Sequence, residues 1–135
     1  MKKNKFVLVS LLFSLNVIAN PVTEKDILVK MKEQYVKALS GSGSAAMEIS
    51  QALAEKILPQ KNGIQPFEEW QRIAAENGYK NAQHAYAQTL WSKRKASKYY
   101  SIRARYWAER AAIQGFAPAT ELLKIFDNEE RLNSK

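Results

Sequence analysis

The chain has 135 residues, of which 46% are hydrophobic and 25% charged, with a formal net charge of +8 and no cysteine. This length suffices for one modest domain. The absence of cysteine excludes disulfides, thiol catalysis and thiolate metal sites. We therefore expect helix packing alone to hold the fold together, and the excess of basic residues to favour an acidic partner.

The N-terminal segment, residues 1–19, has the layout of a secretory signal peptide. Three lysines precede an apolar run over residues 6–19, which is short for a bilayer-spanning helix. The run ends in a plausible cleavage site at Ala19. We predict cleavage there, export to the periplasm, and a single domain over residues 20–135. An uncleaved membrane anchor is the alternative.

The first predicted helix pair covers residues 24–57. Apolar residues recur at helical spacing until Gly41, which supplies the left-handed conformation that ends many helices. Ser42 or Ser44 then opens the second helix of the pair. A linker over residues 58–63, containing proline and glycine, breaks the pattern.

The second predicted pair covers residues 65–92. Pro66 suits the first helical turn, and Gly78 ends this helix. Asn81 is expected to cap the next helix, because its short polar side chain can accept a hydrogen bond from the first turn. Three basic residues, 93–95, form the turn that follows.

The third predicted pair covers residues 97–126. Ser97 is the expected cap of its first helix, Gly115 ends that helix, and Pro118 starts the last one. The tail over residues 127–135 is mostly polar, as is typical of a helix that closes a stack of repeats.

An internal repeat underlies these pairs. Gly41, Gly78 and Gly115 are each 37 residues apart, and the similarity around the last two extends beyond glycine. The residues that align are Trp70 with Trp107, Ala74 with Ala111, Ala75 with Ala112, Tyr79 with Phe116, and Ala82 with Ala119. A fixed period of this size indicates units that bury their apolar faces by stacking on one another. We read the alternation of tryptophan and alanine as a packing pattern, in which the alanines allow close helix approach.

The repeat resembles a known family. Residues 104–119 contain Ala-x-x-Trp-x-x-x-Ala-Ala-x-x-Gly-x-x-x-Ala, which is similar to the Sel-one-like repeat, a short relative of the tetratricopeptide repeat. Residues 67–82 match except that Phe67 replaces the first alanine, and the first unit is degenerate. The turn over residues 92–97 lacks the glycines usual in the family. The resemblance implies an all-α fold, a short solenoid of three antiparallel helix pairs that offers a concave face to a protein.

No constellation in the sequence supports catalysis. His84 is the only histidine, and no second histidine or cysteine stands at metal-ligand spacing from it. Adjacent glutamates at 68–69 and 129–130 diverge on a helix, so we interpret them as solvated residues rather than an acid and base pair. We therefore expect a non-enzymatic protein without a cofactor, a bound metal or a small-molecule substrate.

A basic and aromatic cluster is the strongest candidate for a binding site. The candidate partner-binding residues are Lys98, Tyr99, Arg103, Arg105, Tyr106 and Arg110. Arginine and tyrosine are common interface anchors, so an acidic protein surface fits best. Export disfavours nucleic acid, and no strongly amphipathic basic helix favours anionic lipid. The alternative interpretation is that these residues form an ordinary solvated surface without a partner. Helical geometry puts Arg103, Tyr106 and Arg110 in one stripe and displaces Arg105 from it.

Two classes of function remain in competition. In the first, the chain is a periplasmic immunity protein that docks on a secreted antibacterial effector, such as a lipase or a peptidoglycan-cleaving enzyme. In the second, it is an envelope adaptor or regulatory protein that serves the cell's own machinery. The sequence does not choose between them.

Overall fold

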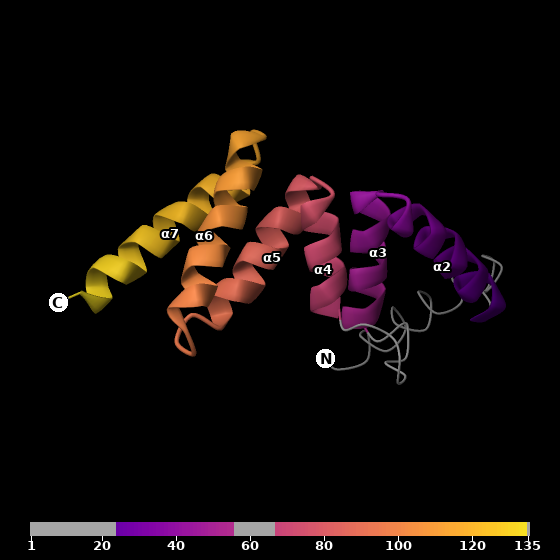
Figure 1. The fold of residues 1–135 in the computed structure, drawn as a ribbon, viewed down its shortest axis with the longest axis horizontal. Coiled ribbons are helices and arrows are strands. Elements are labelled where there is room, and N and C mark those ends of the chain that lie inside the picture. The colour runs from indigo at the N-terminus through magenta and orange to yellow at the C-terminus, as the bar shows by residue number, and fades with distance from the viewer. Residues whose placement is uncertain (1–23, 56–66, 135) are drawn as a thin grey trace, which may run out of the picture. The chain divides into compact units, whose positions relative to one another are not determined.

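The computed structural model describes residues 24–55 and 67–134, which form six α-helices and contain no strand (Figure 1). The helices are α2 (Glu24–Leu39), α3 (Gly43–Ala54), α4 (Phe67–Glu76), α5 (Lys80–Ser92), α6 (Lys98–Ile113) and α7 (Ala117–Asn133). The all-α prediction is thus confirmed for these residues. The predicted signal peptide, its cleavage site, Pro66 and the linker at 58–63 lie outside the described residues.

The chain divides into two units at the boundary between residues 31 and 32. Of the first unit, the structure describes the start of α2. In the second unit, consecutive helices from α3 to α7 each pack against the next one in the chain. Tyr35, near the end of α2, packs edge-to-face with Trp70, and the two ring centroids are 4.8 Å apart.

One backbone motif ends α2, α4 and α6. Gly41, Gly78 and Gly115 have φ angles of 97°, 81° and 74°, a conformation that side chains with a Cβ rarely adopt. Each glycine N–H donates to the carbonyl oxygen three residues earlier, at 2.8–3.0 Å. The next N–H donates to the carbonyl five residues earlier, at 3.0–3.2 Å. These paired bonds satisfy the last carbonyls of each helix, and the three predicted helix ends are confirmed.

The helix starts follow the same turns. Ser42 and Ser97 cap α3 and α6, accepting hydrogen bonds from first-turn N–H groups at 3.3 and 3.2 Å, and Pro118 lies in the first turn of α7, as predicted. The prediction that Asn81 caps α5 is wrong. Tyr79 holds the cap position without a side-chain hydrogen bond, because the glycine turn starts the next helix immediately after it.

The repeated small and bulky residues form the core of the second unit. Trp70 and Trp107 are 3% and 5% exposed, and Ala74, Ala75 and Ala111 are fully buried. The alanines precede the glycine turn by one helical turn, where a larger side chain would hold neighbouring helices apart. Their predicted packing role agrees with this burial.

A buried glutamine that the sequence did not single out connects two of the glycine turns. Gln83 on α5 is 2% exposed. Its Nε2 donates to the carbonyl oxygen of Ala75 at 3.1 Å, and its Oε1 accepts from Nε2 of Gln114 at 2.7 Å. The side chain therefore links the ends of α4 and α6, and both halves of its buried amide have a partner.

Trp91 is a second core residue that the sequence did not single out. Its ring stacks on that of Phe126 at a centroid distance of 3.8 Å and an interplanar angle of 17°. Its Nε1 donates to a carboxylate oxygen of Glu129 at 3.0 Å, and that carboxylate also pairs with Arg94 at 2.6 Å. Glu129 is thus a structural partner of α5 rather than a solvated residue, which corrects the interpretation made from the sequence.

A substitution at Gly43 tests the close approach at the start of α3. A Cβ at Gly43 would lie 2.7 Å from the Cβ of Tyr79 and 3.0 Å from the carbonyl oxygen of Ala74. We expect Gly43→Ala to lower the free energy of unfolding by about 1–3 kcal/mol, measured by urea denaturation. The exposed neighbour Ser44 provides the control, since Ser44→Ala should change it by no more than about 0.5 kcal/mol. Unchanged or increased stability of Gly43→Ala would contradict this contact, because alanine is otherwise the better helix former.

Candidate protein-binding face

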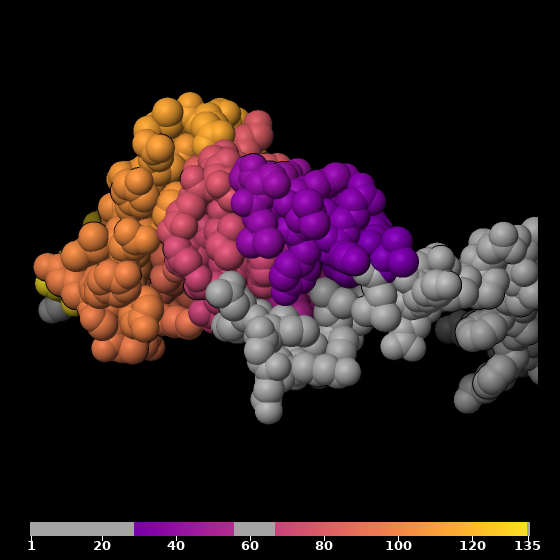
Figure 2. Space-filling view, turned by 45° about the vertical axis from the view of Figure 1, so that its right-hand side comes forward, coloured from indigo at the N-terminus to yellow at the C-terminus, as the bar shows by residue number. Residues whose placement is uncertain are grey.

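The basic and aromatic candidates all lie on α6. This helix starts at the Ser97 cap and buries a stripe of small residues and Trp107 against its neighbours. Figure 2 shows the orange surface of α6 and the turn before it beside the pink surface of α5. The structure therefore places the six predicted contacts on one rigid element rather than on a loop.

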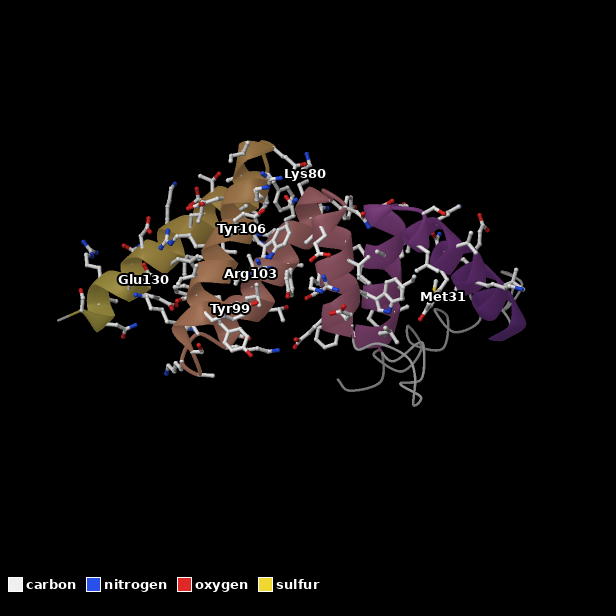
Figure 3. The ribbon with its side chains drawn as sticks, in the orientation of Figure 1. Met31, Lys80, Tyr99, Arg103, Tyr106 and Glu130 are labelled. Atoms are coloured by element: carbon white, nitrogen blue, oxygen red, sulfur yellow. The ribbon has the colours of Figure 1, made fainter. Side chains whose placement is uncertain are left out.

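Three of these residues point to the same side. Tyr99, Arg103 and Tyr106 follow one another along the front of α6 (Figure 3). Tyr99 and Tyr106 are 59% and 45% exposed, large values for aromatic side chains. Lys98, in the first turn, and Arg110, in the last turn, are also exposed.

Two guanidinium groups lie against one aromatic ring. The Arg103 and Arg110 guanidinium carbons are 5.8 and 5.9 Å from the centroid of the Tyr106 ring. Arg103 is also 5.7 Å from the ring of Trp107, which itself meets Tyr106 edge-on at 5.0 Å. Cation–π attraction at these distances holds the arginines on the tyrosine face. The predicted stripe of Arg103, Tyr106 and Arg110 is present.

Arg105 is displaced from this stripe toward α7. Its guanidinium pairs with Asp127 and with Glu130 on α7, each at 2.9 Å. Arg105 thus joins α6 to α7 within the chain. By contrast, neither Arg103 nor Arg110 has a carboxylate within ion-pair distance among the described residues.

A surface groove runs beside the stripe between α6 and α7. Its volume is about 320 Å³. The lining residues are Lys98, Ser101, Ile102, Arg105, Tyr106, Glu109 and Glu130. Because both signs of charge and an aromatic ring line this shallow groove, it has the composition of a protein contact surface more than that of an enclosed ligand pocket.

Two apolar residues of this face were not predicted from the sequence. Ile102 is 59% exposed and Ile113 is 81% exposed. Their spacing from Tyr106, four residues before and seven after, was the available signal. Isoleucine is normally buried, and the sequence alone assigned neither residue to the candidate face.

The basic turn before α6 is largely engaged within the chain. Lys93 pairs with Glu68 at 2.5 Å, and Arg94 pairs with Glu129 while lying 5.0 Å from the ring centroid of Trp91. Because Lys93 and Arg94 are paired with carboxylates, α6 presents, within the described part of the chain, more unpaired positive charge than the turn that precedes it. These contacts also show that Glu68, like Glu129, is not simply solvated.

His84 lies on α5, and its imidazole ring packs against the aromatic ring of Phe116. Its ring meets Phe116 edge-on at 5.4 Å, and its buried Nδ1 has no hydrogen-bond partner in the part of the chain that the structure describes. Burial lowers the pKa of this imidazole below its ordinary value of 6.5. Within residues 24–55 and 67–134, no group of three or more His, Cys, Asp or Glu side chains is placed to hold a metal ion.

The lowered pKa of His84 has a measurable consequence. The unfolded chain binds a proton at His84 at higher pH than the folded chain does, so stability falls as the pH drops through the ordinary imidazole pKa. We expect wild type to lose more stability than His84→Gln between about pH 7.5 and 5.5. Thermal unfolding of both proteins across this range measures the difference. Identical pH dependence would show that His84 titrates alike in both states.

Within the described ranges, no helix combines the length and hydropathy that a bilayer-crossing segment requires. No protein-family model matches this chain, and neither a curated protein nor a solved structure matches it. The functional interpretation of the α6 face therefore rests on its own geometry and charge.

Proposed function

We propose that the chain is a non-catalytic protein-binding module that docks through the outward face of α6. The observation that carries this proposal is the surface cluster in which the half-buried Arg103 and the exposed Arg110 both lie against the exposed ring of Tyr106. Tyrosine and arginine are enriched among residues that dominate binding energy, and a half-buried and an exposed guanidinium group beside one another favour a carboxylate-rich partner. The cluster of Arg103, Tyr106 and Arg110 contains no histidine, carboxylate, serine or cysteine that could act as a catalytic base or nucleophile.

The repeated turn motif supports a repeat architecture. Gly41, Gly78 and Gly115 adopt the same conformation at equal intervals, and the residue after each one is the N-cap of the next helix. We propose that the three helix pairs form a short solenoid of the Sel-one-like type, with a degenerate first unit. Such arrays commonly present extended surfaces to protein partners.

The proposed setting is the periplasm, from the signal-peptide layout of residues 1–19. There, we propose, the chain acts as an immunity protein that neutralises a secreted antibacterial effector, such as a lipase or a peptidoglycan-cleaving enzyme. The cationic face would cover an acidic surface beside the effector's active site. An envelope adaptor serving the cell's own machinery is the second candidate, and an effector gene beside this chain's reading frame would favour immunity.

Charge reversal on α6 tests the proposal. An envelope-acting lipase or peptidoglycan hydrolase encoded next to this chain is assayed with and without it, and the affinity is measured by calorimetry. We expect Arg103→Glu with Arg110→Glu to weaken binding by about 2–4 kcal/mol and to abolish inhibition. Cells that express this double variant should be sensitive to the effector. Helicity should be unchanged, since neither residue belongs to the buried stripe.

A matched control separates docking from general electrostatics. Lys30→Glu with Lys32→Glu makes the same change of charge at exposed positions on α2. This control should preserve inhibition and slow association slightly at low salt. Full protection by the α6 double variant would place the docking surface elsewhere. Binding to the effector without inhibition would favour the adaptor function.

A further inference from the structure

The outward side of α6 has the spacing of a coiled-coil seam. Tyr99, Ile102, Tyr106 and Ile113 fall at positions a, d, a and a of a heptad, and Glu109 takes the remaining d position. The four apolar members are 45–81% exposed. Residues spaced alternately three and four apart share one helix face, and a second helix packs against such a face. The residues that α6 buries lie on the opposite side of the helix.

Basic residues flank this seam on both sides. Arg103 and Arg110 occupy the two e positions, and Lys98 and Arg105 occupy g positions. Charges at e and g positions select the partner of a coiled coil. Arg105 already pairs with two carboxylates of a neighbouring helix, α7, whereas no such pair is found for the two e-position arginines within the described ranges.

We propose that α6 receives a single amphipathic helix of the partner protein, with apolar residues at its seam and acidic residues on its flanks. This inference rests on the proposed function and specifies which element the partner presents. A helix of 16 residues is about 24 Å long, so the contact extends over somewhat more than two heptads. The acidic flanks of the partner pair with Arg103 and Arg110 while its apolar seam covers the tyrosines and isoleucines.

Charge argues against a second copy of this chain as the occupant. Outside α6, the described part of the second unit has two exposed apolar pairs at heptad spacing: Val36 and Leu39 on α2, 61% and 77% exposed, and Ile125 and Leu132 on α7, 50% and 68% exposed. Lys124 and Arg131 flank the α7 pair at g positions, and its acidic e-position residue, Glu129, already pairs with Arg94. The residues at e and g beside the α2 pair, Ser40 and Tyr35, carry no charge. Basic flanks facing basic flanks repel, and the same holds for α6 against α6. A different protein with acidic flanks is therefore the better match.

Designed peptides test this inference. The first has leucine at a and d and glutamate at e and g over about three heptads, the second replaces the glutamates with lysine, and the third scrambles the order of the first. Fluorescence anisotropy with the full chain measures each affinity. We expect the glutamate-flanked helix to bind about tenfold or more tightly than either other peptide. Arg103→Glu with Arg110→Glu should reverse this preference, and Arg103→Gln with Arg110→Gln should remove it.

The controls separate the possible outcomes. Lys30→Glu with Lys32→Glu should keep the preference. Equal binding of the glutamate- and lysine-flanked peptides, or a preference that survives reversal at Arg103 and Arg110, overturns the inference. Equal binding of the scrambled peptide overturns it too, because binding would then depend on the charge of the peptide and not on its helical pattern. Effector inhibition that needs both arginines, without peptide binding, leaves the proposed function standing and refutes the helical partner. Peptide binding without effector inhibition supports the helix inference and refutes the immunity function.

Discussion

Replacing Phe126 with alanine is expected to lower the free energy of unfolding by about 3–5 kcal/mol, the largest effect predicted for this chain. Phe126 has no exposed surface and lies face to face with Trp91 at 3.8 Å. Removing the ring forfeits the transfer free energy of its atoms and leaves a cavity between α5 and α7. Trp91 cannot fill that cavity freely, because its Nε1 donates to Glu129.

Chemical denaturation, with tryptophan fluorescence as the probe, measures this loss. The adjacent residue offers a matched control, since Ile125 lies on the same helix and is 50% exposed. Ile125→Ala should cost no more than about 1 kcal/mol. If both alanine variants unfold at the same denaturant concentration, the packing of α7 on α5 described here is wrong.

Replacing Ala111 with leucine is expected to lower the free energy of unfolding by about 1–3 kcal/mol. Ala111 is fully buried one turn before Gly115, and its carbonyl oxygen accepts the N–H of Phe116 in the turn that starts α7. A leucine there must either displace the neighbouring helix or adopt a strained rotamer. Leucine is more hydrophobic than alanine, so a loss of stability would have to come from steric overpacking and not from reduced hydrophobic burial.

A leucine at an exposed alanine distinguishes overpacking from any general effect of the substitution. Ala117, the first residue of α7, is exposed, and Ala117→Leu should change stability by no more than about 0.5 kcal/mol. Equal melting temperatures for Ala111→Leu and the wild type would mean that this site has room for three more carbon atoms. The proposed register of the repeat would then be incorrect.

Helix type and helix ends were predictable from the sequence, because both depend on local chemistry. The glycine period located three turns that share one set of hydrogen bonds, and Ser42 and Ser97 cap helices as their short hydroxyl side chains predict. Asn81 shows the limit of this reasoning. A favourable capping side chain has no effect where the backbone turn has already started the helix two residues earlier.

The candidate face was predictable only in part. Periodicity placed Arg103, Tyr106 and Arg110 on one stripe and displaced Arg105, and the structure agrees. Ile102 and Ile113 were not assigned to the face, although each lies about 160–200° around the helix from the buried Ala104 and Ala111. Whether such a face is buried depends on which other helix reaches it.

The sequence by itself determined the helical class, the positions of the glycine turns and the identity of the cationic helix, since each follows from conformational preference or spacing within one segment. The tertiary structure alone decided which charges are already paired. Arg105 and Arg103 are two residues apart on one helix, yet Arg105 meets the carboxylates of α7 while Arg103 lies on Tyr106. That difference arises from contacts between segments more than twenty residues apart in the sequence. The spacing of residues along the chain does not show which of these segments lie close together in the fold.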